Sequence, residues 1–112
     1  MEIEIKHLTK EDITIILGKA FELPWWNENK VEDFIDKILK FEEVSIYNSE
    51  NGKEYTLDLD ELYEGIELFV KNGGSANISN YDLIDGDYIL QYTLFGKVCY
   101  NITISKRFVK DK

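Results

Sequence analysis

The chain has little of what most catalytic and metal sites require. It contains one cysteine, one histidine and one proline in 112 residues. A single cysteine excludes an internal disulfide framework, and Cys99 and His7 lie too far apart in the sequence to form a recognisable metal-ligand motif. No apolar run approaches the roughly 20 residues of a membrane span, and residues 1–8 lack the basic and apolar regions of a signal peptide. We therefore expect a cytoplasmic protein without membrane partner, metal or cofactor.

Basic residues are also scarce. Twenty-two acids against thirteen lysines and arginines give a formal net charge of −9. A protein that binds nucleic acid directly needs a basic surface, so the composition disfavours that class. The excess of acid either keeps the protein soluble or attracts a basic partner. With 44% hydrophobic and 13% aromatic residues, the chain can form a hydrophobic core, and we expect residues 1–112 to be one globular domain.

Apolar periodicity predicts an α+β domain. Alternation typical of strands occurs in residues 2–8, 43–47, 53–57 and 98–104. A turn that contains Asn51-Gly52 is expected to join the second and third of these strands. Helical spacing occurs over residues 10–22, from a cap at Asn29 to about residue 40, and from a cap at Asp58 or Asp60 to the glycines after Asn72. We expect a small, mainly antiparallel sheet of about four strands with three or four helices packed on one face.

Residues 83–95 are compatible with either element. As a helix, the segment would be capped by Asp82, carry Asp85 and Asp87 in its first turn and end at Gly96. The side buried in this helix would comprise Ile84, Tyr88, Gln91, Tyr92 and Phe95. As a strand, the segment would form a hairpin with residues 98–104. We favour the helix because three acids cluster at its start.

No catalytic constellation is recognisable. A pair formed by Cys99 and His7 would require two neighbouring strands, and alternation in residues 98–104 predicts that Cys99 is a packed, inert thiol. Acids are so numerous that pairs of carboxylates arise by chance, and no glycine-rich phosphate loop is present. We predict a non-enzymatic protein without catalytic residues; an enzyme using Asp and Glu side chains is a third class of function.

The acidic stretch 50–67 is one candidate binding surface. On a helix, Asp60, Glu64 and Glu67 form a row because residues three and four apart are neighbours. This row of charge is spaced comparably to the phosphates of a nucleic acid, and the surface could mimic one. The candidate partner-binding residues here are Asp58, Asp60, Glu61, Tyr63, Glu64 and Glu67. A solvated helix face explains the same pattern.

The segment 23–27 is the second candidate, because it carries both tryptophans next to the single proline. Two adjacent indoles in one loop do not easily both enter the core. We expect one of Trp25 and Trp26 to pack and the other to serve as an anchor for a partner.

Two parts of the chain resemble known families. Residues 3–47, with Leu-Pro-Trp-Trp-Asn-Glu-Asn at 23–29, resemble the barstar-like ribonuclease inhibitors, although Asn27 stands where that family has glycine and under half of the chain is covered. The resemblance implies a partner-binding surface formed by Trp25, Trp26, Asn29, Asp33 and Asp36. Residues 82–100 look like small uncharacterised proteins of phages and mobile elements. This resemblance implies a genomic setting but does not suggest an activity.

The first function hypothesis is an inhibitor that binds a basic, nucleic-acid-handling protein, of the phage anti-defence or anti-CRISPR type. The alternative is an immunity protein or antitoxin that neutralises a partner ribonuclease toxin. Both place binding on acidic and aromatic side chains, and neither involves direct contact with nucleic acid.

Overall fold

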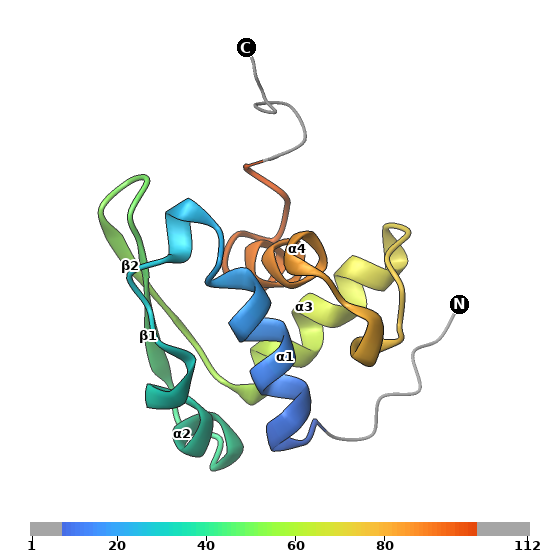
Figure 1. The fold of residues 1–112 in the computed structure, drawn as a ribbon, viewed down its shortest axis with the longest axis horizontal. Coiled ribbons are helices and arrows are strands. Elements are labelled where there is room, and N and C mark those ends of the chain that lie inside the picture. The colour runs from blue at the N-terminus through green and yellow to red at the C-terminus, as the bar shows by residue number, and fades with distance from the viewer. Residues whose placement is uncertain (1–7, 101–112) are drawn as a thin grey trace.

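The computed structural model describes residues 8–100 and has helices on one side of a two-stranded hairpin (Figure 1). Its α-helices are α1 (Lys10–Ala20), α2 (Ile35–Leu39), α3 (Leu59–Lys71) and α4 (Leu83–Phe95). Short 3-10 helices are η1 (Pro24–Trp26), η2 (Val31–Asp33) and η3 (Ile78–Asn80). The strands are β1 (Val44–Asn48) and β2 (Lys53–Leu57). The broad α+β class is as predicted.

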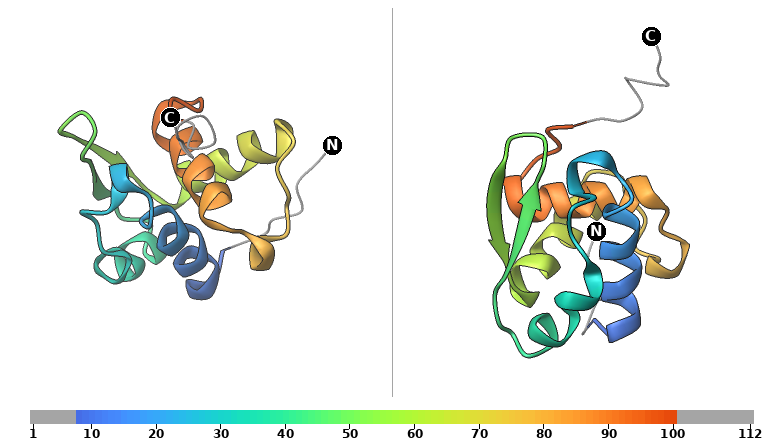
Figure 2. Two further views of the ribbon diagram at one scale, coloured as in Figure 1. Left: turned by 45° about the horizontal axis from the view of Figure 1, so that its top comes forward. Right: turned by 60° about the vertical axis from the view of Figure 1, so that its left-hand side comes forward.

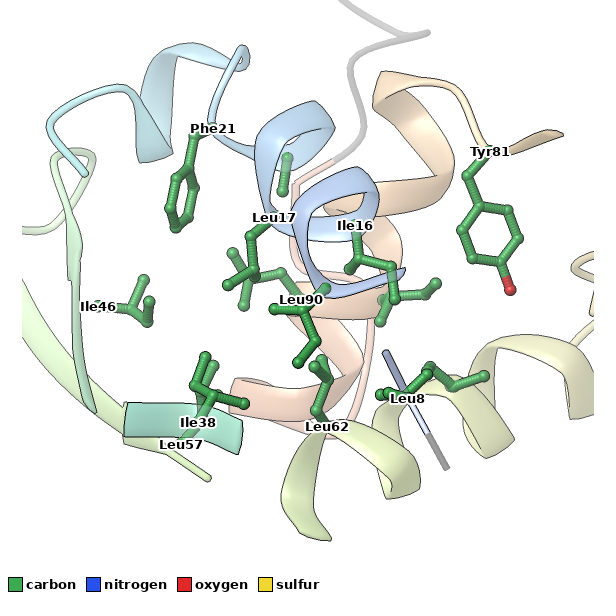
Figure 3. Packing of buried hydrophobic residues seen from close by; sticks show 14 of the residues in the cluster. Leu8, Ile16, Leu17, Phe21, Ile38, Ile46, Leu57, Leu62, Tyr81 and Leu90 are labelled. Atoms are coloured by element: carbon green, nitrogen blue, oxygen red, sulfur yellow. The ribbon is translucent and has the colours of Figure 1, made fainter. Parts of the chain in front are cut away.

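Helix α4 packs against both α1 and α3 (Figures 1 and 2). Figure 3 shows Leu90 of α4 between Leu17 of α1 and Leu62 of α3, and all three side chains are buried. At the crossing with α1, a Cβ on Gly86 would lie 2.5 Å from the carbonyl oxygen of Ile16. Glycine is required there because a helix backbone, unlike a side chain, has little room to move away.

The hairpin closes the other side of the core. Its antiparallel register runs from Val44 opposite Leu57 to Asn48 opposite Lys53. The turn contains Gly52 with φ of 73°, a left-handed conformation that glycine adopts without steric cost. The predicted turn at positions 51–52 is therefore confirmed.

Helices α1, α3 and α4 each begin with a capping box. In each, an N-cap side chain accepts a hydrogen bond from the backbone N–H three residues later, and the acid at that later position accepts one from the N-cap N–H. The pairs are Thr9 with Asp12, Asp58 with Glu61, and Asp82 with Asp85. These caps are local in sequence, which explains why the starts of α1, α3 and α4 were predictable.

The predicted sheet of about four strands was too large for the part of the chain described. Residues 8–100 contain two strands, and the predicted strand 2–8 lies outside this range except for Leu8, which is buried in the core. Val98, Cys99 and Tyr100 are not in a strand, and the rest of the predicted strand 98–104 lies outside the description. Residues 83–95, in contrast, form the helix that we favoured.

The helix predicted after Asn29 is also different in the structure. It is divided into η2 and the five-residue α2, with Phe34 between them. Asn29 caps neither: its Oδ1 accepts from the Tyr47 backbone N–H at 2.9 Å, and its Nδ2 donates to the Tyr47 carbonyl at 2.8 Å. The Asn29 amide thus replaces a neighbouring strand at the edge of β1, a role that only the tertiary fold defines.

Candidate functional site

The outer side of α3 is an exposed row of acids. Asp60, Glu61, Glu64 and Glu67 are exposed, whereas the opposite side of α3 is buried through Leu59, Leu62, Gly65, Ile66, Phe69 and Val70. Tyr63 and Asp58 are half-buried at the margins of this row. The predicted row therefore exists as a surface, and its binding role stays a prediction.

Acidic side chains in the first turn of α3 and at the start of the hairpin lie close enough to repel each other. Partial burial raises the pKa of Glu61, and the hydrogen bond from the Asp58 backbone opposes this rise. The negative charges of Asp58, Glu43 and Glu64 raise the pKa further. Glu43 precedes β1, where the register places it near Asp58. We define the acidic face as Glu43, Asp58, Asp60, Glu61, Glu64 and Glu67.

Phe41 lies next to this face in the chain and is the large hydrophobic side chain most open to solvent in the described region, with 62% of its surface exposed. Its φ is +62°, in the left-handed region that usually takes glycine at the end of a helix. Its N–H donates to the Ile38 carbonyl at 3.0 Å, and the Glu42 N–H donates to the Lys37 carbonyl at 2.9 Å. This pair of bonds is the Schellman motif that ends α2.

Phe41 was not predicted as a surface residue from the sequence. It stands seven positions after Phe34 and three after Ile38, a spacing that continues the apolar stripe of the preceding helix. The one available signal was a helix that ends without glycine. A non-glycine residue in this conformation costs about 1 kcal/mol. The fold thus exposes an aromatic ring, at some cost in stability, directly before Glu42 and Glu43.

The two tryptophans of η1 point toward the same buried acid. Both indole N–H groups donate to Oδ1 of Asp87, each at 2.7 Å. Trp26 is fully buried and presents no surface to a partner, which corrects its place among the contact residues. Trp25 is half-buried and packs on Tyr100 with ring centroids 5.1 Å apart. Trp26 is therefore the indole that packs, and the role of Trp25 as an anchor for a partner stays a prediction.

Asp87 is the largest difference between sequence and site. It was expected among the acids in the first turn of α4, but it is fully buried and also accepts from Nε2 of Gln91 at 2.8 Å. Burial raises the pKa of Asp87 to about 6, although the hydrogen bonds from Trp25, Trp26 and Gln91 lower it. The available signal was Gln91 four residues later on the same helix face.

The buried side of α4 accordingly differs from the predicted one. The buried residues are Gly86, Asp87, Ile89, Leu90 and Gln91, and of the predicted set only Gln91 belongs to them. Ile84, Tyr88, Tyr92 and Phe95 are half-buried, because α4 is covered by α1 and α3 together and not by one layer.

The residues implied by the barstar-like resemblance separate into two groups. Trp26 and Asn29 are committed to internal hydrogen bonds. Asp33 at the end of η2 and Asp36 in α2 are exposed. The structure therefore leaves two carboxylates and part of Trp25 as the accessible portion of that implied surface.

A cavity of about 320 Å³ lies between the end of α3 and the start of α4. Its lining comprises Phe69, Asn72, Gly73, Gly74, Ser75, Ile84, Asp85, Tyr88 and Tyr92. The polar groups serve local structure: Asp85 accepts from the Asp82 N–H, and the Ser75 hydroxyl accepts from the Asn77 N–H. Burial raises the pKa of Asp85, the hydrogen bond with Asp82 lowers it, and the charge of Asp82 raises it.

Cys99 is exposed, so the prediction of a packed thiol was wrong. His7 lies outside the described residues. Among residues 8–100, no three His, Cys, Asp or Glu side chains gather as a metal site would require. Within the same range, none of the helices has the length and apolar character needed to cross a membrane.

Comparisons with protein-family models, with curated proteins and with solved structures find no match to this chain. The resemblances of residues 3–47 and 82–100 therefore stay predictions. Function has to be argued from the acidic face, Phe41 and the residues around Asp87.

Proposed function

We propose that the protein is a cytoplasmic, non-enzymatic inhibitor that binds a basic, nucleic-acid-handling protein, of the phage anti-defence or anti-CRISPR type. One observation carries this proposal: an exposed aromatic ring, Phe41, held in a left-handed backbone conformation two positions before Glu43 of the acidic face. Strained and exposed residues of this kind tend to occur at functional surfaces.

The two parts of this surface have different physical roles. The acidic face attracts a basic partner over a distance, which raises the association rate and makes it dependent on salt. Phe41 supplies apolar area that a pocket of the partner can bury, which slows dissociation. A net charge of −9 suits a surface that occupies the site of a nucleic acid on its partner.

The alternative is an immunity protein or antitoxin that neutralises a ribonuclease toxin. The exposure of Asp33 and Asp36 supports it, because these carboxylates follow the tryptophan loop as the barstar-like resemblance implies. The two proposals place the partner on different parts of the chain, and this makes them separable.

Three variants separate the proposals. The first is Phe41→Gly, which removes the ring and favours the left-handed backbone. The second combines Asp60→Lys, Glu64→Lys and Glu67→Lys, and leaves Glu61 in place because it caps α3. The third combines Asp33→Lys and Asp36→Lys as the matched control on the other acidic surface.

Wild-type protein is used to capture a basic protein from a lysate of the source organism, and affinity is then measured with the purified partner at low and high salt. We expect Phe41→Gly to weaken binding by roughly tenfold or more while raising thermal stability. The triple-lysine variant should lose most affinity and most of its salt dependence, and the control should bind like wild type. Wild-type protein should also displace nucleic acid from the partner.

Binding that depends on Asp33 and Asp36 and not on the acidic face would support the immunity proposal. If the captured protein retains its nucleic acid at saturating concentrations of the inhibitor, the first proposal is wrong.

A further inference from the structure

The carboxylate of Asp87 is surrounded by donors. It has 0% of its surface exposed. Its Oδ1 accepts both indole N–H groups of Trp25 and Trp26, and its Oδ2 accepts from Nε2 of Gln91. An indole nitrogen donates only, and an amide nitrogen likewise has no acceptor capacity. These contacts suit an ionised carboxylate and offer no acceptor to a protonated one.

Gln91 carries the same hydrogen-bond network to the segment after α4. Its Nε2 also donates to the Tyr100 carbonyl at 2.9 Å. Its Oε1 accepts from the backbone N–H of Cys99 at 2.7 Å and of Tyr100 at 2.8 Å. The orientation of this amide follows from its partners, because two backbone N–H groups require the oxygen. Gln91 therefore holds residues 97–100 against α4.

Tyr100 extends the attachment to other elements. Its ring packs on Trp25, and it meets Phe95 with ring centroids 6.1 Å apart. Its hydroxyl accepts from Nδ2 of buried Asn48, at 3.2 Å. When the segment is attached, Tyr100 thus covers aromatic surface of η1 and α4.

We propose that the ionised Asp87 carboxylate sets the orientation of the Gln91 amide, so that proton uptake at Asp87 releases residues 97–100 from α4. This inference concerns a conformational device and is independent of the proposed function.

The coupling follows from counting donors and acceptors. A protonated Asp87 needs an acceptor for its O–H, and rotation of the Gln91 amide by half a turn is the local way to supply one. That rotation turns Nε2 toward the N–H groups of Cys99 and Tyr100, and it turns Oε1 toward the Tyr100 carbonyl as well as toward Asp87. The hydrogen bond between Asp87 and Gln91 is kept with its direction reversed, whereas the other three hydrogen bonds of the Gln91 amide are lost. A buried group without a partner is costly.

Within residues 8–100, the side chains that form this hydrogen-bond network with Asp87 are neutral, so Asp87 is the one among them that titrates in mildly acidic solution. η1 contributes the two tryptophans, β1 reaches the network through neutral Asn48, and the segment after α4 contributes Tyr100. Tyr88 of α4 is neutral there, since burial and then the charge of Asp87 raise its pKa. Burial raises the pKa of Asp87 to about 6, which places the transition near this pH.

The test is amide hydrogen exchange of Cys99 and Tyr100 by NMR, corrected for intrinsic rates. Wild-type protein is measured at about pH 5 and about pH 7.5, on either side of the Asp87 pKa of about 6. We expect protection of both amides to be roughly tenfold lower at the acidic pH. Amides of Leu17 and Ile66, in α1 and α3, should stay protected at both and report that the fold persists.

Two variants reproduce the two states without a change of pH. Asp87→Asn keeps an oxygen for the indoles but turns an NH₂ group toward Gln91, as protonation would turn an O–H. Protection of Cys99 and Tyr100 should be low at both pH values. Adding Gln91→Glu to Asp87→Asn supplies oxygens to the new amide and to both backbone N–H groups, but it loses the hydrogen bond to the Tyr100 carbonyl. Protection should therefore return in part at about pH 7.5, where the new carboxylate is ionised.

Equal wild-type protection at the two pH values would overturn the proposal, and this measurement decides the question even if Asp87→Asn does not fold. So would an Asp87→Asn protein whose Cys99 and Tyr100 amides are as protected as in wild type. A double variant no better protected than Asp87→Asn would show that the Gln91 amide is not the link.

Discussion

Helices α3 and α4 have the same length and the same kind of start, but they differ in what covers them. Each has 13 residues and begins with an aspartate in a capping box. α3 packs one side into the core and exposes acids on the other, whereas α4 is covered by both α1 and α3 and buries Asp87 and Gln91. The apolar periodicity of a surface helix thus predicts which side is buried, whereas the periodicity of a central helix does not.

The difference also separates two kinds of polar residue. Asp60, Glu64 and Glu67 of α3 are solvated, so replacing one of them is expected to change little besides binding. The polar groups of α4 are in contact with the rest of the molecule, so each replacement is transmitted to η1 or to residues 97–100. We therefore predict that changes in the free energy of unfolding are largest for polar groups inside α4 and smallest for the caps at the starts of α3 and α4.

The largest effect expected is the pH dependence caused by Asp87. Its pKa is raised from 3.8 to about 6 in the folded protein, so the native state binds the proton more tightly than the unfolded state does. The resulting contribution to stability is present in full below pH 3.8 and is lost as pH rises through about 6. At about 1.4 kcal/mol per pH unit, this interval corresponds to roughly 3 kcal/mol.

Urea unfolding of wild type and Asp87→Asn over this pH range measures the effect. The free energy of unfolding of wild type should fall relative to that of the variant by about this amount, since the other acids are common to both. Parallel curves would show that Asp87 does not carry the dependence. If the prediction holds, acid stabilises the whole fold and at the same time loosens residues 97–100. General charge repulsion does not produce this combination.

The second effect tests the central position of α4. Gly86→Ala should destabilise the protein by about 2 kcal/mol, because the new methyl group meets the backbone of α1 at Ile16. Gly18→Ala is the matched control: it lies within α1, and a Cβ there has nothing within 4 Å. That substitution should stabilise by about 0.5–1 kcal/mol. Thermal unfolding of the two variants would contradict this account if both changes had the same sign.

The smallest effect concerns the shared helix starts. Asp58→Ala in α3 and Asp82→Ala in α4 should each reduce the free energy of unfolding by about 1 kcal/mol, because each removes the acceptor for the backbone N–H three residues later. Similar values from urea unfolding would show that capping is local and indifferent to what covers the helix. A much larger loss at Asp82 would mean that the cap also maintains the contacts of α4.

The structural features that were predictable from the sequence have one property in common: each is caused by residues a few positions apart. The capping pairs, the turn at Gly52 and the exposed acids of α3 follow from short-range rules. The continuous helix predicted after Asn29 failed because a competing partner, the edge of β1, lies 18 positions away. Asp87 was misinterpreted for the same reason, since its indole donors are 61 and 62 positions away.

The sequence by itself determined the acidity of this protein, the starts of α1, α3 and α4, the hairpin turn and the α+β class, because each depends on composition or on neighbouring residues. Only the tertiary structure decided the number of strands in the described region, the burial of Trp26, the conformation and exposure of Phe41, and the carboxylate to which both tryptophans donate. These features depend on which distant groups compete for the same hydrogen bonds and the same core volume, and that competition is settled when the chain packs.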